Sequence, residues 1–91
     1  MKATIGGKRY DTAKCEELGR ITHYNHSNNE VGWTTLERAT DGVLLVFCDS
    51  RDIFLRDYLI LFSDSELTID SFKLDEQQEK RCAELGLIKI V

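Results

Sequence analysis

The 91-residue sequence contains no proline, no low-complexity tract and no internal repeat. It has no run of about 18 apolar residues, the length that a membrane-spanning helix needs. Its first residues also lack the apolar core of a secretory signal peptide. Apolar residues make up 42% and charged residues 31% of the chain, which is typical of folded globular proteins and not of disordered ones. We therefore expect a single domain over residues 1–91 that does not cross a membrane.

Cysteine is scarce. Cys15, Cys48 and Cys82 are odd in number and lie far apart, and no C-x-x-C motif occurs. A secreted disulfide-rich domain of this size would carry a denser and even set. The three residues are therefore interpreted as structural thiols, and the sequence predicts a cytoplasmic protein in a reducing compartment.

The common catalytic motifs are missing as well. The sequence contains no G-x-S-x-G, no P-loop and no H-E-x-x-H. His23 and His26 lie three residues apart, but a zinc site would need further ligands, such as Cys15 or Cys48, to fold over them. We expect no enzyme activity, no cofactor and no metal site.

No excess of positive charge is present either. The net charge is −4, and residues 49–76 carry eight acidic and three basic side chains. A general nucleic-acid-binding domain would show a basic stripe instead, so direct binding to nucleic acid is not expected. The acidic segment favours a basic partner surface or serves solubility alone.

The chain opens with a hairpin signal. Lys2–Ile5 and Lys8–Tyr10 flank the pair Gly6-Gly7, and both positions of this pair accept the positive φ angles of a tight turn. The following residues, Thr12–Leu18, have acidic residues in their early turns and precede Gly19, which predicts a short helix.

A second hairpin is predicted in the middle of the chain. Residues 31–40 and 43–48 are rich in β-forming side chains and flank Asp41-Gly42, a typical two-residue hairpin turn. Such a turn would pair Thr40 with Val43. Residues 43–48 are apolar on both faces, which predicts a central strand covered on both sides.

The C-terminal half gives weaker signals. Asp75 precedes a helical segment that reaches about Leu85, and Gly86 would end it. The other expected elements are a loop at residues 23–29, a short helix at Arg51–Asp57 and strands at Tyr58–Phe62, Leu67–Phe72 and Leu87–Val91. The whole pattern predicts an α+β fold with an antiparallel sheet of two β-hairpins and two helices.

Residues 5–12, I-G-G-K-R-Y-D-T, resemble the I-x-G-K-R-Y-D-T hairpin and helix of a group of small proteins carried by phages and integrative elements. Residues 35–45, T-L-E-R-A-T-D-G-V-L-L, fit the group's E-T-L-Y-R-T-K-x-G frame and its apolar continuation. Residues 75–84 match the acidic helix with which many members end. Several of these look-alikes are anti-CRISPR proteins, inhibitors of bacterial CRISPR immunity. The resemblance implies a mobile-element protein that acts by binding a host protein in the cytoplasm of the bacterial host cell.

The acidic segment is the main candidate site under that resemblance. Carboxylates could imitate a phosphate backbone and occupy the Lys/Arg-lined channel of a CRISPR effector. The candidate partner-binding residues are Asp49, Asp52, Asp57, Asp64, Glu66 and Asp70, with Trp33 as an apolar anchor. The alternative is a homodimeric structural or regulatory module without a CRISPR target, which would pair through the apolar strand Tyr58–Phe62.

Overall fold

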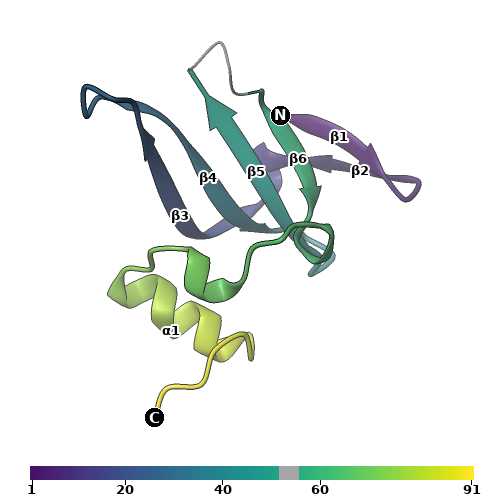
Figure 1. The fold of residues 1–91 in the computed structure, drawn as a ribbon. Coiled ribbons are helices and arrows are strands. Elements are labelled where there is room, and N and C mark those ends of the chain that lie inside the picture. Colours follow the sequence, from purple (N-terminus) through teal and green to yellow (C-terminus); the bar gives the residue numbers. More distant parts are fainter. Residues whose placement is uncertain (52–55) are drawn as a thin grey trace.

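The computed structural model describes residues 1–51 and 56–91 (Figure 1). Two antiparallel sheets and one α-helix make up the regular structure of these residues. The strands are β1 (Lys2–Ile5), β2 (Lys8–Asp11), β3 (Glu16–Tyr24), β4 (Glu30–Arg38), β5 (Leu44–Ser50) and β6 (Tyr58–Leu61). The helix is α1 (Glu76–Glu84), and the 3-10 turns are η1 (Thr12–Lys14), η2 (Phe62–Asp64) and η3 (Ile69–Ser71). The α+β class with antiparallel strands is confirmed. The predictions of two α-helices and of one sheet that contains both hairpins are wrong for the described residues, because β1 and β2 pair only with each other.

The four strands β3 to β6 form one meander in the order β3-β4-β5-β6, and β1 and β2 form a separate hairpin. Figure 1 shows α1 below one end of the meander and the hairpin behind β6. The sheet therefore has a helix on one side and a hairpin on the other.

The first hairpin is confirmed. Gly6 and Gly7 have φ angles of 58° and 80°, as the turn between paired strands requires. The helix expected over Thr12–Leu18 is wrong: a single 3-10 turn is followed at once by β3. Because the segment is short and only weakly amphipathic, pairing with β4 outweighs its helix preference.

The second hairpin is confirmed, but its register differs by one residue. Ala39, and not Thr40, pairs with Val43, whose carbonyl accepts a 2.9 Å bond from the Ala39 N–H. Gly42 has a φ of 88° and closes a three-residue loop, with the carboxylate of Asp41 accepting from the Val43 N–H at 3.1 Å. The dipeptide Asp-Gly suits both loop lengths, so sequence could not decide between them.

The C-terminal half contains one confirmed helix and two wrong strand predictions. α1 begins after Asp75, whose carboxylate accepts from the Gln78 N–H at 2.8 Å, and Gly86 follows its end with a φ of 75°. The strand expected at Leu67–Phe72 is an irregular segment with the turn η3, and Leu87–Val91 forms no strand. The strand at Tyr58–Phe62 is confirmed as β6.

Two of the remaining predictions have mixed outcomes. The loop expected at residues 23–29 begins two residues later, because β3 continues to Tyr24. The helix expected at Arg51–Asp57 falls largely on residues 52–55, which lie outside the described residues.

Two clusters of buried side chains lie on opposite sides of the meander. The helix-side core consists of Leu18, Leu36, Val46, Phe72 and Cys82. The hairpin-side core consists of Tyr10, Ala39, Leu45 and Leu59. β5 contributes to both, since successive side chains of a strand point to opposite faces. The prediction of a central strand covered on both sides is thereby confirmed.

Candidate functional site

Three of the predicted site residues lie on the connection between β6 and α1, residues 62–75, which is called the acidic connection below. Asp64, Glu66 and Asp70 are all exposed. The apolar residues between and beside them, such as Leu67 and Ile69, pack against the helix-side core. The connection therefore turns its carboxylates outward while its apolar side chains anchor it to the protein.

Local hydrogen bonds fix this connection further. The hydroxyl of Ser65 donates to the carbonyl of Phe62 at 2.7 Å. The hydroxyl of Ser71 accepts from the Thr68 N–H at 3.1 Å. These bonds satisfy backbone groups that a segment without strand or helix partners would otherwise leave open. The backbone that carries the three carboxylates is thus held in place on both sides of Glu66.

The three carboxylates also have no cationic partner within the described part of the chain. The ion pairs found there use Asp41, Glu17, Glu16 and Glu84 as their acids. A partner that binds Asp64, Glu66 and Asp70 would therefore have no intramolecular ion pair to break.

The other acidic candidates lie elsewhere. Asp57 directly precedes β6, and its carboxylate accepts from the Ser50 N–H at 2.8 Å. It therefore holds the end of β5 next to the beginning of β6. Asp49 is half-buried on β5, directly opposite Trp33 of β4. Asp52 lies outside the described residues. β6 alone is about 13 Å long at the usual rise per residue, so Asp57 and Asp64 belong to opposite ends of it.

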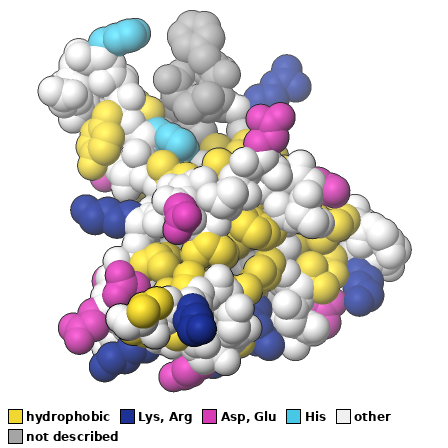
Figure 2. All heavy atoms as spheres, turned by 60° about the horizontal axis from the view of Figure 1, so that its bottom comes forward, with side chains coloured by type: hydrophobic (Ala, Val, Ile, Leu, Met, Phe, Trp, Pro, Cys, Tyr) yellow, Lys and Arg dark blue, Asp and Glu magenta, His cyan; other side chains and the backbone are white. Residues whose placement is uncertain are grey.

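Charges of both signs occur near the acidic connection. Figure 2 brings the lower side of Figure 1 forward and shows Asp and Glu side chains interspersed with Lys and Arg around a band of hydrophobic side chains. The acidic residues do not form an uninterrupted patch on this face. The arrangement fits a few discrete contacts better than wholesale imitation of a nucleic-acid backbone.

Trp33 lies on the hairpin side of the sheet and is half-buried. The guanidinium carbons of Arg20 and Arg51 lie 4.7 Å and 5.7 Å from its ring centroid, within the range of cation–π attraction. Trp33 is therefore an aromatic residue capped by cations and is not part of the acidic surface. No sequence pattern indicates Arg20, because residues 12–18 are predicted to be helical and only the pairing of β3 with β4 brings this side chain beside Trp33.

A buried carboxyl group was missed as well. Glu37 is only 7% exposed and lies directly opposite Glu17 across the β3–β4 pair. Its Oε1 accepts from the Thr35 hydroxyl at 3.4 Å, and its Oε2 has no partner. Burial, and next the negative charge of Glu17, raise the pKa of Glu37 to about 7. Alternation along β4 could have placed Glu37 on the face of Trp33, but its opposition to Glu17 requires β3.

The histidines and cysteines do not converge. His23 Nε2 lies 2.7 Å from the Thr34 hydroxyl, whereas His26 belongs to an exposed loop. Cys15, Cys48 and Cys82 are free thiols. Within residues 1–51 and 56–91, no three or more His, Cys, Asp or Glu side chains are placed to hold a metal ion.

The sequence matches no model of a known protein family, and searches of curated proteins and of solved structures also give no match. In the described residues, no helix combines the length and the apolar character needed to cross a bilayer.

Proposed function

We propose that this protein is an anti-CRISPR-type inhibitor that binds a bacterial CRISPR effector and blocks its nucleic-acid path, and that Asp64, Glu66 and Asp70 make the contact. The resemblance of residues 5–12 and 35–45 suggests the class of target. The observation that carries the contact is the exposed, unpaired state of the three carboxylates on an anchored backbone.

Electrostatics gives the physical reason. A channel that binds nucleic acid is lined by Lys and Arg, and its affinity for phosphates comes largely from their charge. Carboxylates held in place at its entrance would compete for the same cations and would speed the encounter. A fixed backbone lowers the entropic cost of binding. The inhibition would be steric and electrostatic, without turnover, and would weaken as the salt concentration rises.

Trp33 takes no part in this contact. It lies on the hairpin side of the sheet, whereas the acidic connection packs against the helix-side core. If the effector also covers Trp33, it does so with a second part of its surface.

Binding to a panel of purified, guide-loaded CRISPR effectors would test the proposal. Wild-type protein should be retained by one effector and should reduce its binding to target DNA. The variant Asp64→Asn/Glu66→Gln/Asp70→Asn should lose roughly 3- to 150-fold in inhibition, because each of the three lost pairs with a channel cation contributes about 0.2–1 kcal/mol. The matched control Glu30→Gln/Glu76→Gln/Glu79→Gln removes the same charge from other exposed positions and should inhibit like wild type.

Two results would overturn the proposal. If no effector of the panel is retained or inhibited, the assignment to CRISPR inhibition fails. If one effector is inhibited and both triple variants are weakened equally, the contact depends on net charge and not on the acidic connection.

The homodimeric module is the second candidate. β6 lies at the edge of the four-stranded sheet, and edge strands can pair with another chain. Its Leu59 is already buried in the hairpin-side core, while Tyr58 is 38% exposed. Sedimentation as a dimer at micromolar concentration, with protection of the β6 amides from hydrogen exchange, would favour this function over inhibition.

A further inference from the structure

Three side chains of β4 follow one another on the hairpin side of the sheet. Trp33, Thr35 and Glu37 occupy alternate positions of the strand, so all three point to this face. Arg20 of β3 lies directly opposite Thr35, midway between the other two. Because Trp33 and Glu37 are only about 13 Å apart along the strand, the long side chain of Arg20 can reach toward either of them.

In the structure, Arg20 is turned toward Trp33 and Glu17. Its Nη2 lies 2.7 Å from the Glu17 Oε1, and its guanidinium carbon lies 4.7 Å from the ring centroid of Trp33. A guanidinium has five N–H donors, and within the described residues only the carboxylate of Glu17 accepts a bond from them. Arg20 can therefore serve a second acceptor without losing the first.

Glu37 is an acceptor that lacks donors. It is 7% exposed, and its Oε1 accepts from the Thr35 hydroxyl at 3.4 Å, whereas its Oε2 has no hydrogen-bond partner. A neutral carboxyl group tolerates such burial far better than a carboxylate does. The observed contacts therefore fit the protonated form, and ionisation of Glu37 would require a cation close by.

The strands on either side of Glu37 offer one such cation. Burial, and next the charge of Glu17, raise the pKa of Glu37, and the charge of Arg20 lowers it. On β5 the residue opposite Glu37 is Leu45. The charged residue of β5 on this face is Asp49, which lies opposite Trp33 and cannot stabilise a second carboxylate.

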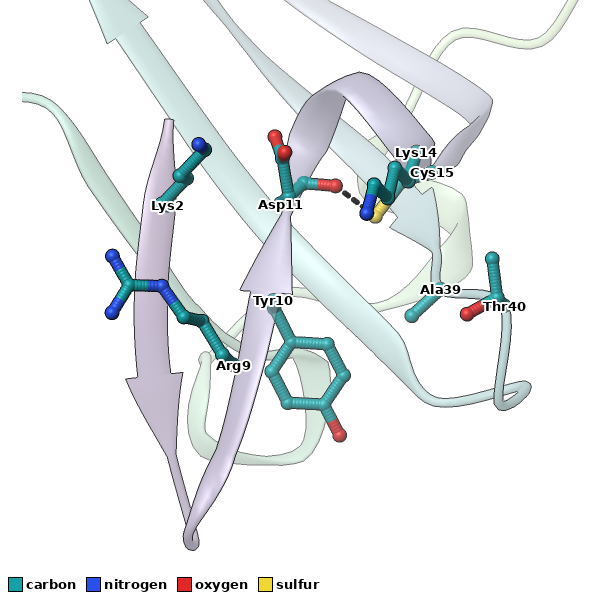
Figure 3. A pocket seen from close by; sticks show the side chains of 8 residues that line it. All are labelled: Lys2, Arg9, Tyr10, Asp11, Lys14, Cys15, Ala39 and Thr40. Carbon is teal, nitrogen blue, oxygen red and sulfur yellow. Dashed lines mark hydrogen bonds between the residues drawn. The ribbon is translucent and has the colours of Figure 1, made fainter.

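The first hairpin and η1 contribute two further titratable groups. The amino group of Met1 also lowers the pKa of Glu37, but it donates to the Thr12 hydroxyl at 2.8 Å. The thiol of Cys15 donates to the backbone carbonyl of Asp11 at 3.3 Å, the bond drawn in Figure 3. Burial, and next the charge of Glu37, raise the pKa of this thiol. Both groups are thus engaged within the N-terminal segment.

We propose that Arg20 and Glu37 form a pH-sensitive switch: when Glu37 loses its proton, the guanidinium of Arg20 turns from Trp33 toward Glu37 and bridges it to Glu17. One cation then lies between two carboxylates and offsets their repulsion. The ring of Trp33 loses its cover on the side of Arg20, and the face gains one negative charge. The switch is independent of the proposed inhibition, which depends on the acidic connection.

Acrylamide quenching of Trp33 fluorescence would test the switch, because the chain has a single tryptophan. The quenching constant should rise between pH 5 and pH 8, as the ring becomes more accessible. Its midpoint should lie below about pH 7, because the bond to Arg20 favours the ionised form of Glu37. The ¹³C shift of the Glu37 carboxyl group should titrate with the same midpoint.

Variants of the two switching residues should remove the transition. Glu37→Gln cannot ionise and should keep the weak quenching of low pH throughout. Arg20→Gln should show no pH-dependent quenching and should raise the pKa of Glu37. Arg51→Gln is the matched control: it removes the other cation over the ring, 5.7 Å from the centroid. Since the Arg51 N–H donates to the carbonyl of Val31, near the opposite end of β4, this variant should keep the transition.

The histidines provide a second control, because they also titrate between pH 5 and pH 8. His23→Gln/His26→Gln should behave like wild type. A transition that persists in Glu37→Gln, or that disappears in the histidine variant, would overturn the role of Glu37.

Two further outcomes would overturn the movement of Arg20. One is titration of the Glu37 carboxyl group without any change in quenching, which would show that Arg20 stays over Trp33. The other is a rise in quenching that coincides with loss of circular dichroism at 222 nm, which would show unfolding. A constant dichroism signal from pH 5 to pH 8, together with the quenching transition, is the expected result.

Discussion

The two sides of the four-stranded sheet are built differently. On the helix side, all five members of the buried cluster are apolar side chains or a thiol, Leu18, Leu36, Val46, Phe72 and Cys82. On the hairpin side, a smaller apolar cluster shares the sheet with Glu37, a carboxyl group that is buried without a partner for one oxygen. The helix side is thus an ordinary apolar core, whereas the hairpin side buries a carboxyl group, which lowers the free energy of unfolding.

The position of the first hairpin explains the difference. Residues of β1 and β2 pack against Leu45 and Leu59 of β5 and β6. On the neighbouring β3 and β4, a charged side chain covers this face instead. Arg20 forms an ion pair with Glu17 and lies over the ring of Trp33. A two-stranded hairpin is too narrow to cover all four strands, so this half of the sheet carries the charged groups.

The largest expected loss of stability comes from shortening a fully buried leucine, and it would show whether the two sides of the sheet unfold together. Leu36 and Leu45 are both fully buried, one on each side, and replacing either by alanine should cost about 3 kcal/mol of unfolding free energy. Because β5 contributes to both cores, the two sides should unfold as one unit in urea. Trp33 fluorescence would follow the hairpin side, and circular dichroism at 222 nm would follow α1. Separate midpoints in Leu45→Ala would break this expectation.

Glu37→Gln should have the next largest effect, with the opposite sign. The pKa of Glu37 is raised to about 7, above its unfolded value, so its protonated form is the one that the fold prefers. Stability from this group is fully present below about pH 4.5 and is lost as the pH rises through about 7. The variant should therefore be about 2–3 kcal/mol more stable than wild type at pH 8, with no gain at pH 4.

Urea unfolding at several pH values would check this prediction. Glu66→Gln is the matched control, because Glu66 is exposed, and its stability should follow that of wild type. A gain in Glu37→Gln that is the same at pH 4 and pH 8 would show that burial of a charge is not the difference between the two sides.

The smallest effect should come from the helix itself. Asp75 caps α1 through the Gln78 N–H, and the Gln78 side chain accepts from the Asp75 N–H at 3.0 Å. Asp75→Ala should cost about 1 kcal/mol and should lower the midpoint of unfolding without separating fluorescence from circular dichroism. A loss restricted to the helical signal would mean that α1 detaches from the helix side by itself.

Local patterns predicted several elements correctly. Gly6-Gly7 and Asp41-Gly42 each mark a hairpin, and Asp75 with Gly86 brackets α1. These signals work because turn and cap geometries demand particular residues within a few positions. Local patterns could not determine the register of the second hairpin, because Asp41-Gly42 fits a two-residue and a three-residue loop equally well. The hydrogen bond from the Ala39 N–H to the Val43 carbonyl shows that the loop has three residues.

Predictions that depended on distant partners failed. Residues 16–18 became a strand because β4 offered a partner, and Leu67–Phe72 stayed irregular while its apolar side chains packed against the helix-side core. The candidate site divided for the same reason. Asp64, Glu66 and Asp70 share one connection, whereas Asp57 became a cap and Asp49 lies beside Trp33 on the sheet.

The sequence by itself determined the antiparallel α+β character, the two hairpins, the cap of α1 and a strand apolar on both faces, because each depends on neighbours a few residues away. Tertiary structure decided which side chains oppose one another across strands. It placed Glu37 opposite Glu17 and Arg20 over Trp33. Such pairs are fixed by the register and packing of segments distant in sequence, which no local pattern contains.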